Sequence, residues 1–409
     1  MSQVDVGEAI TQIHREEWAR VVATLTRHFG DLDVAEEAAA EAFATAVKRW
    51  PAEGVPANPG GWLTTTARRK ALDRIRRESK RDDKQKQAQM LYDDRPDALG
   101  AVGDERLRLM FTCCHPALAP EARVALTLRL VGGLTVPEIA HAFLVQEATM
   151  GQRITRAKAK IKAARIPYRV PSAEDLPVRV SGVCAVLYLV FNEGYLASGP
   201  DTDPVRHDLT AEAIRLARLL RELMPTDGEV AGLLALMLLT EARRAARVSA
   251  NGELVTLDQQ DRGAWDADLI AEGHRLVRER LGTGQPPGRY QILAAINAVH
   301  TSARDIRDTD WSQIVTLYDQ LARLDPSPIV ALNRAVAIAE LDGPDVALAI
   351  LDRLRDALVR YHPYFAARAD LLRRLGRSEE SRAAYDRAIA LAGNSAETAY
   401  LSRRRDQLR

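Results

Sequence analysis

The clearest alternation of apolar and polar positions in this chain of 409 residues lies between Leu134 and Lys162. Residues 138 to 143 predict a short helix, residues 144 to 146 a tight connection, and a longer helix begins at about Glu147. On the longer helix, apolar residues recur at steps of three and four and form one stripe: Met150, Ile154, Ala157 and Ile161. The pattern predicts a helix-turn-helix, whose second helix fits the major groove of DNA.

The opposite face of the longer helix is polar and cationic. It carries Thr149, Gln152, Arg153, Arg156 and Lys160. Arg and Gln side chains suit the edges of guanine and adenine. Between Ala148 and Ala173 there are seven Lys or Arg and no acidic residue, which favours contact with phosphate. The alternative is an ordinary amphipathic helix pair with a solvated basic face, and the pattern alone leaves both open.

Two helices are expected near the amino terminus, over residues 8 to 29 and from Asp33 to Trp50. Asp33 and Glu36 have the spacing of a capping box. The apolar side of the second helix is expected to bury Ala35, Ala39, Ala42, Phe43, Ala46, Val47 and Trp50. Its outer side forms an acidic patch of Glu36, Glu37 and Glu41. These glutamates either bind a partner or only complement the helix dipole.

Residues 51 to 61 form a loop rich in Pro and Gly, which leads into a basic helix that begins with Trp62. The cations of this helix are Arg68, Arg69, Lys70, Arg74, Arg76, Arg77, Lys80 and Arg81. A solvated basic helix is the usual explanation. A loop that feeds a basic helix through an aromatic residue also suits the capture of single-stranded DNA. Residues 82 to 103 predict a linker, and helices are expected over 105 to 111 and 120 to 130.

Three segments occur in a particular order: DVAEEAAAEAFATAVKRW, WLTTTARRKALDRIRR and LTVPEIAHAFLVQEATMGQRITRAKAKI. In this order they resemble regions 2 and 4 of an extracytoplasmic-function sigma factor of bacterial RNA polymerase, over about residues 8 to 170. The resemblance implies that core polymerase meets the helix with Asp33, Glu36, Glu37, Glu41 and Phe43. It implies that Trp62 and the helix with Arg68, Arg69, Arg76, Arg77 and Lys80 read and open the minus-ten element. The helix with Thr149, Gln152, Arg153, Arg156 and Lys160 would read the minus-thirty-five element. Two positions depart from the family pattern: Arg69 stands where these proteins often carry Asn, and Leu144 stands where the turn often carries Gly.

Residues 182 to 282 lie beyond that pattern and resemble the helical extension of sigma factors with long carboxy-terminal additions. Residues 183 to 191 predict a fully buried helix, and Asn251-Gly252 predicts a tight turn in a small hairpin. Several polar residues either line a pocket or serve as helix caps and interhelix ion pairs: Asn192, Glu193, Glu241, Arg243, Arg244, Asp258, Asp261 and Arg262. We expect caps and ion pairs.

Residues 289 to 409 repeat at a step of 34 residues, which places Ala347 over Ser381 and Leu351 over Tyr385. An earlier copy places Tyr318 about one repeat before Leu351. A helix pair at this step, with small residues where the helices cross, is typical of tetratricopeptide repeats. Such arrays bind a protein or ligand and do not catalyse reactions.

The composition favours an all-α fold, with 46% apolar residues and few aromatic ones. The net charge is only +1, so a nucleic-acid surface must come from local segregation of charge. Cys113, Cys114 and Cys184 form no disulfide pattern and suit a reducing cytoplasm, and we expect packing, not metal binding, at Cys113-Cys114-His115. The chain shows no signal sequence, and its apolar runs are too short to span a bilayer.

We therefore expect four all-α parts: residues 1–95 (region 2 bundle), 96–172 (region 4 helix-turn-helix), 173–285 (helical extension) and 286–409 (repeats). The expected function is that of a cytoplasmic sigma factor with no catalytic residues, metal or cofactor. Its partners would be core polymerase, promoter DNA and a regulatory protein or ligand on the repeats, with no membrane. The alternative is a one-component DNA-binding regulator, whereas an enzyme lacks support because no nucleophile–base pair or phosphate loop is present. The extension either braces regions 2 and 4 or folds back over them.

Overall fold

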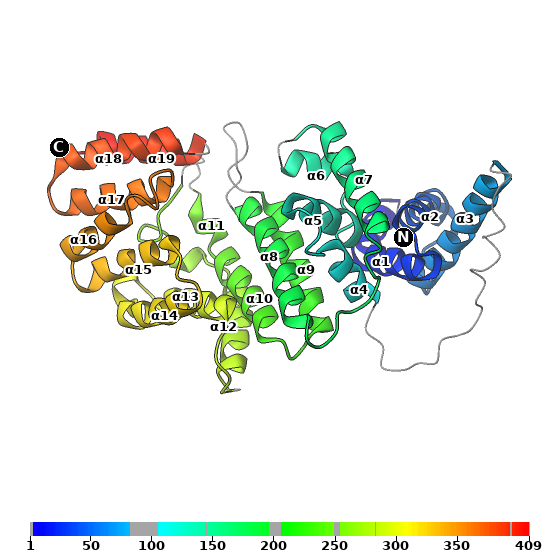
Figure 1. Cartoon of the computed structure of the whole chain (residues 1–409), viewed down its shortest axis with the longest axis horizontal. Coiled ribbons are helices and arrows are strands. Elements are labelled where there is room, and N and C mark those ends of the chain that lie inside the picture. The colour runs from blue at the N-terminus through cyan, green and yellow to red at the C-terminus, as the bar shows by residue number, and fades with distance from the viewer. Residues whose placement is uncertain are drawn as a thin grey trace. The chain divides into compact units, whose positions relative to one another are not determined.

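The computed structural model of the chain describes residues 3–81, 105–143, 145–195, 206–248, 254–282, 284–392 and 395–408. Within these ranges the chain forms helices and one isolated antiparallel bridge, between Val248 and Leu254 (Figure 1). The predicted all-α fold is confirmed. The chain divides into two compact units, Met1–Leu189 and Val190–Arg409, called unit 1 and unit 2 below. The predicted linker and the Asn251-Gly252 turn lie outside the described residues.

Unit 1 begins with three long helices: α1 (Gln3–Phe29), α2 (Leu32–Glu53) and α3 (Pro59–Arg81). α1 ends at Gly30, whose φ of +68° suits glycine. The carboxylate of Asp31 then accepts hydrogen bonds from the backbone N–H groups of Asp33 and Val34 and caps α2. The expectation that Asp33 caps this helix and pairs with Glu36 is therefore wrong by two positions, because an earlier aspartate occupies the cap.

The loop before α3 is shorter than the sequence suggests. α2 continues through Pro51 to Glu53, and Gly54 ends it with a φ of +81°. A proline near the end of a helix removes only one backbone donor, and the fully buried Trp50 just before it holds the last turn in place. Most of the predicted inner side of α2 is buried as expected. Val47 is not, since 54% of it is exposed.

The second half of unit 1 contains α4 (Glu105–Cys113), α5 (Pro120–Leu126), a π-helical turn (Thr127–Val131), α6 (Val136–Ala142) and α7 (Glu147–Ala163). Thr135 and Glu138 form a capping box at the start of α6. The Thr135 N–H donates to the Glu138 carboxylate at 2.6 Å, and the Glu138 N–H donates to the Thr135 hydroxyl at 3.3 Å. α7 begins at Glu147 as predicted. Leu144, in the turn between them, lies outside the described residues.

α8 (Leu176–Tyr195) contains the apolar run expected to be fully buried. Two of its positions correct that expectation, because Ala185 is exposed and Leu189 is 49% exposed. Among the described residues, α8 is the one helix long and apolar enough to cross a membrane, judged by length and composition alone. Only 39% of its apolar stretch is buried, but a core helix passes the same test, so the finding is weak support for a membrane span.

Unit 2 is built around α10 (Gly228–Glu241), in which every residue from Val230 to Glu241 is buried. It packs against α9 (His207–Leu223), α12 (Ala267–Leu281) and α13 (Arg289–Ser302). α11 (Arg244–Arg247) and a 3₁₀ turn (Arg262–Ala264) lie between α10 and α12 in the chain. α10 carries a long apolar run with no polar face, so its sequence requires other helices to cover it on several sides.

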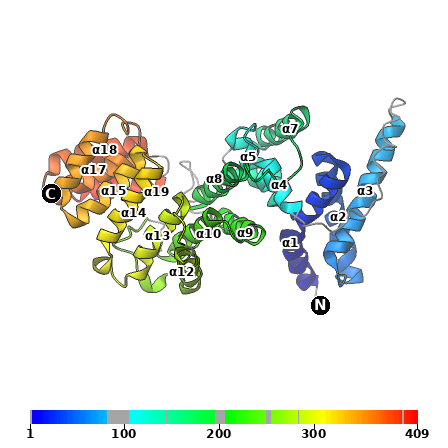
Figure 2. The ribbon, with the colours of Figure 1, turned by 60° about the horizontal axis from the view of Figure 1, so that its bottom comes forward.

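The remainder of unit 2 is a row of helices that pack on their chain neighbours. After a 3₁₀ turn (Ile306–Asp308) these are α14 (Trp311–Leu324), α15 (Pro328–Leu341), α16 (Pro344–Leu354), α17 (His362–Arg374), α18 (Ser378–Leu391) and α19 (Ser395–Asp406). Figure 1 shows α14 to α18 side by side in chain order, and Figure 2 shows α14, α15, α17 and α18 of the same row from another direction. Ala347, Leu351, Ser381 and Tyr385, placed in register by the 34-residue step, are all buried.

A close helix crossing in unit 2 supplies a test of the fold. A Cβ atom on Gly232 of α10 would lie 2.5 Å from the backbone nitrogen of Gln291 on α13. Gly232→Ala should therefore lower the free energy of unfolding by about 1–3 kcal/mol, because the two backbones must move apart. Gly151→Ala on α7 is the matched control: its new methyl meets only an ordinary contact at 3.9 Å. That variant should be more stable by about 0.5–1 kcal/mol. Urea unfolding followed by circular dichroism measures both, and an unchanged Gly232→Ala protein would contradict the tight crossing.

Candidate nucleic-acid interface

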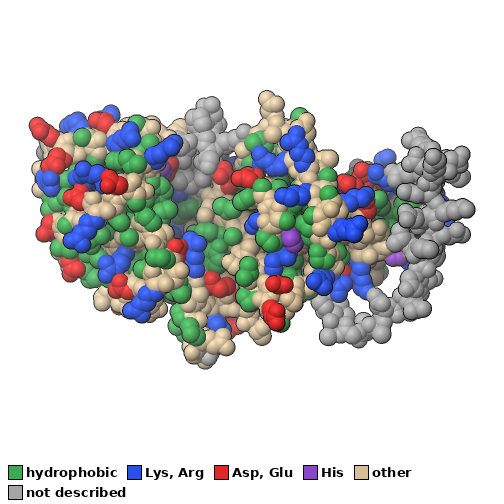
Figure 3. All heavy atoms as spheres, viewed as in Figure 1, with side chains coloured by type: hydrophobic (Ala, Val, Ile, Leu, Met, Phe, Trp, Pro, Cys, Tyr) green, Lys and Arg blue, Asp and Glu red, His purple; other side chains and the backbone are tan. Residues whose placement is uncertain are grey.

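α7 presents one polar face to solvent. Met150, Ile154, Ala157 and Ile161 are buried, as the three- and four-residue spacing predicts. Of the residues expected on the outer face, Thr149, Gln152, Arg156 and Lys160 are exposed and Arg153 is half-exposed. The Arg156 guanidinium donates to the Gln152 amide oxygen at 3.3 Å. Figure 3 shows Lys and Arg side chains gathered over the α6–α7 part of unit 1. Long donors on an exposed helix face are what recognition in the major groove requires.

α3 presents a second basic surface. Arg68, Arg69, Arg76 and Arg77 are exposed, whereas the side chain of Lys80 lies outside the described residues. The cations that face α2 are engaged: Lys70 lies 3.6 Å from Glu41, and Arg74 pairs with Glu37. These pairs tie α3 to α2. The arginines on the other faces of α3 remain accessible to a polyanion.

Trp62 lies at the start of α3 and is half-exposed. Its ring packs edge-on against Trp50 of α2, with the ring centroids 5.3 Å apart. Asn58 closes the preceding turn, because its amide oxygen accepts from the Gly61 N–H at 2.9 Å. Trp62 is therefore anchored on one side and open on the other, which suits an aromatic residue that packs in the protein and also stacks on a base.

The amino-terminal end of α2 does not have the predicted outward patch. Glu37 and Glu41 are about half-exposed, but Glu36 is only 7% exposed, so the expectation that it faces solvent is wrong. Glu36 pairs with Arg129 of the π-helical turn and with Lys158 of α7. Asp33 lies 2.8 Å from the same Lys158 amine. One turn later, Lys162 lies 3.1 Å from Asp31.

This ion-pair cluster, consisting of Asp31, Asp33, Glu36, Arg129, Lys158 and Lys162, joins α2 to the helix-turn-helix. Burial alone would lower the pKa of Lys158, but the carboxylates of Glu36 and Asp33 raise it above its ordinary value. Lys158 therefore stays charged at neutral pH although its side chain is only 10% exposed. A buried charge of this kind is tolerated because its partners are fixed around it.

Aromatic residues support the ion-pair cluster from α1. The Trp18 indole N–H donates to the Arg129 carbonyl at 3.2 Å, and the Arg129 guanidinium lies over the Trp18 ring at 5.8 Å. Phe43 is buried against Trp18 and His14, with centroids 5.8 and 4.7 Å away. Arg129, Lys158 and Trp18 were missed by sequence reasoning. A single cation inside the apolar segment VALTLRLV was the available signal for Arg129.

The cysteines and the polar residues of the extension have ordinary structural surroundings. Burial raises the pKa of Cys114 to about 11, and its thiol lies 3.3 Å from the Thr127 hydroxyl. The described residues hold no group of three His, Cys, Asp or Glu side chains placed to bind a metal ion.

In unit 2, Asp261 caps a 3₁₀ turn and Arg262 donates to the His300 and Ala303 carbonyls. Caps and hydrogen bonds thus account for Asp261 and Arg262, whereas Glu241 and Arg244 line a pocket and also pair with each other.

Comparison with known families matches three segments of the chain. Residues 15–81 match sigma-70 region 2, residues 108–161 match sigma-70 region 4, and residues 179–281 match a family of unknown function, DUF6596. A relative from Rhizobium meliloti (strain 1021), itself called an uncharacterized protein, is 46% identical over 398 residues. The alignment covers 95% of this chain and 93% of that protein. No solved structure matches the chain.

The ion-pair cluster predicts a large effect of one substitution. Glu36→Ala leaves Arg129 and Lys158 without their shared carboxylate in a mostly buried site, which should lower the free energy of unfolding of unit 1 by about 3–5 kcal/mol. The matched control is Glu37→Ala, which breaks an exposed pair on the same helix and should cost about 1 kcal/mol or less. Urea unfolding measures both. Equal effects of the two substitutions would remove the ion-pair cluster from the stabilising contacts of unit 1.

Proposed function

Because the chain belongs to the sigma-70 family of RNA polymerase sigma factors, and is similar to the extracytoplasmic-function class with a helical extension, we propose that it directs promoter-specific initiation of transcription. The observation that carries the proposal is the pair of exposed basic helices, α3 and α7, in one unit whose two halves match regions 2 and 4 in order. A DNA reader of a single site needs only one such helix. Two suit a protein that contacts two separated promoter elements.

In this proposal α7 reads the minus-thirty-five element. Gln152, Arg153 and Arg156 make the base contacts, while Thr149 and Lys160 serve the phosphates. α3 acts at the minus-ten element, with Arg68, Arg69, Arg76, Arg77 and Lys80 following the backbone and Trp62 stacking where the strands separate. Core polymerase binds α2 through Asp33, Glu36, Glu37, Glu41 and Phe43. The reaction takes place in the cytoplasm and uses no catalytic group, metal or cofactor of this chain.

The ion-pair cluster places a condition on this function. Glu36 is only 7% exposed and is paired with Lys158 and Arg129, so polymerase reaches this carboxylate only if α7 separates from α2. Geometry requires the same step. Two elements about 25 base pairs apart are separated by roughly 85 Å on B-form DNA. α7 is only about 25 Å long and is paired with α2, so we assign this arrangement to a closed, promoter-free form.

The second candidate is a one-component regulator that binds DNA without polymerase. The exposed face of α7 favours it, because that face is open even while Glu36 of α2 is covered. The carboxy-terminal helices would then sense a ligand or protein for the DNA-binding half. In either case we assign the extension a regulatory role, with α14 to α19 serving as tetratricopeptide-like repeats that bind a partner.

Transcription in vitro separates the two candidates. With core polymerase and a candidate promoter, the sigma factor yields a specific transcript that is absent when either protein is omitted. Arg153→Ala and Arg156→Ala should each lower promoter use by about tenfold, since a lost bidentate base contact costs about 1–3 kcal/mol. Arg169→Ala, an exposed arginine beyond α7, is the control for charge alone and should have a small effect. A protein that shifts promoter DNA but never supports a transcript is the regulator instead.

Locking the closed form tests the opening step. Cysteines introduced by Asp31→Cys and Lys162→Cys, which replace an ion pair at 3.1 Å, can be joined with a short bismaleimide that contains a disulfide. The joined protein should lose transcription, and dithiothreitol, which cleaves the linker, should restore it. The single variants treated with the same reagent are the controls. Full transcription by the joined protein would show that α2 and α7 need not separate.

A further inference from the structure

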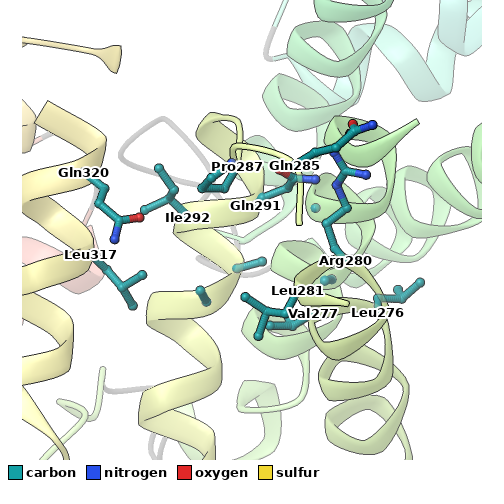
Figure 4. Close-up of a pocket in the computed structure, with 14 residues that line it drawn as sticks. Leu276, Val277, Arg280, Leu281, Gln285, Pro287, Gln291, Ile292, Leu317 and Gln320 are labelled. Carbon is teal, nitrogen blue, oxygen red and sulfur yellow. The ribbon is translucent and has the colours of Figure 1, made fainter. Parts of the chain in front are cut away.

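Helices α10, α12, α13 and α14 of unit 2 enclose a cavity of about 200 Å³ (Figure 4). Its walls are mainly apolar, with Leu276 and Val277 from α12, Ile292 and Ala295 from α13, and Leu317 from α14. Leu281, at the end of α12, also lines it and is 75% exposed, which marks the entrance from solvent. An apolar cavity with one open side and a few polar groups is the usual form of a small-molecule site.

One end of the cavity is polar. Gln291 is only 7% exposed, and its amide oxygen accepts from the Gly288 N–H at 2.7 Å. Its amide nitrogen has no hydrogen-bond partner among the residues that the structure describes. The side chain of Arg280 reaches the same end and donates to Gln285 at 3.1 Å; Figure 4 shows Gln291 and Arg280 pointing toward one another. A buried amide donor without an acceptor costs free energy, so a ligand that supplies the acceptor would be favoured.

The backbone fixes the Gln291 donor in this position. α13 crosses α10 so closely at Gly232 that its Gln291 backbone cannot shift toward α10. A Cβ atom on Gly228 would lie 2.2 Å from the Gln291 amide nitrogen and 2.4 Å from Arg280 Nε, so these two nitrogens lie close together beside the start of α10. The neighbouring carboxylate of Glu229 accepts from the backbone N–H groups of Tyr290 and Gln291. Its oxygens are thus directed to the start of α13.

We propose that this cavity binds a small carboxylate with an apolar tail. The carboxylate accepts from the Gln291 amide and lies beside the Arg280 guanidinium, and the tail lies among Leu276, Ile292 and Leu317. A guanidinium and an amide are the donors that carboxylates favour in proteins. A cavity of about 150 Å³ holds benzene, so this slightly larger one suits a tail of about five to eight carbons. The extension then has a ligand input in addition to any partner on its repeats.

Calorimetric titration of the full-length protein tests the proposed ligand class. The probes are hexanoate and octanoate, with hexan-1-ol, octan-1-ol and hexylamine as matched compounds of other head groups. The carboxylates should bind at least tenfold more tightly than the alcohols, and the amine should not bind. The proposal is overturned if neither carboxylate binds, or if an alcohol binds as tightly as its carboxylate. No polymerase or DNA is present, so the result is independent of the transcription assay.

Two substitutions locate the bound carboxylate. Gln291→Glu keeps the oxygen that accepts from Gly288 but replaces the donor with a negative charge, and it should weaken octanoate binding at least tenfold. The matched control is Gln313→Glu, an exposed position on α14 outside the cavity, which should leave binding unchanged. Ala295→Leu fills the apolar part and should abolish binding while the circular dichroism spectrum is retained. Octanoate binding of wild-type strength in both Gln291→Glu and Ala295→Leu would place the ligand elsewhere and overturn the proposal.

Discussion

The contact of Glu36 with Arg129 and Lys158 is the constraint on which the arrangement of unit 1 depends. It is the point where α2, the π-helical turn and α7 meet, and all three side chains are largely removed from water. Charges in such a place are stable only as a set, because each one that is removed leaves the others unpaired. Trp18 orients Arg129, since its indole N–H donates to the Arg129 carbonyl while its ring lies beneath the guanidinium. The position of the helix-turn-helix against α2 therefore follows from three charges and one aromatic ring.

A contact made of charges differs from an apolar contact in how it opens. When two apolar faces separate, water must cover surface that it solvates poorly, whereas separated ions regain their hydration. The cluster can thus hold the closed form specifically and still release it to a competing surface of matching charge. Core polymerase and promoter DNA are the competitors that the proposed function supplies. On this account, the carboxylates of α2 hold region 4 in the free protein and bind polymerase in the complex.

The sequence is most informative where structure is set by neighbours along the chain. The stripe of Met150, Ile154, Ala157 and Ile161 predicted both the burial of α7 and its exposed face, because a helical period needs only local residues. Glu36 was misjudged since Glu36, Glu37 and Glu41 look alike on one helix, and the partner Arg129 lies 93 residues away. A pattern of neighbouring residues cannot reveal a pair that lies so far apart in the sequence. The roles given to the DNA- and polymerase-binding residues remain predictions, because only bound partners test them.

The cavity in unit 2 lies where a bound ligand would contact α14, the first helix of the row α14 to α19. α12 and α13 line it as well. A ligand in the cavity contacts α12, α13 and α14 together. It changes their relative positions only if it binds one arrangement of these helices more tightly than another. Both α13, at Gly232, and α12, at Gly273, pack closely on the buried α10, so α14 is the lining helix left to adjust. Since each later helix packs on the one before it, a change at α14 is passed on to the helices that would bind a partner.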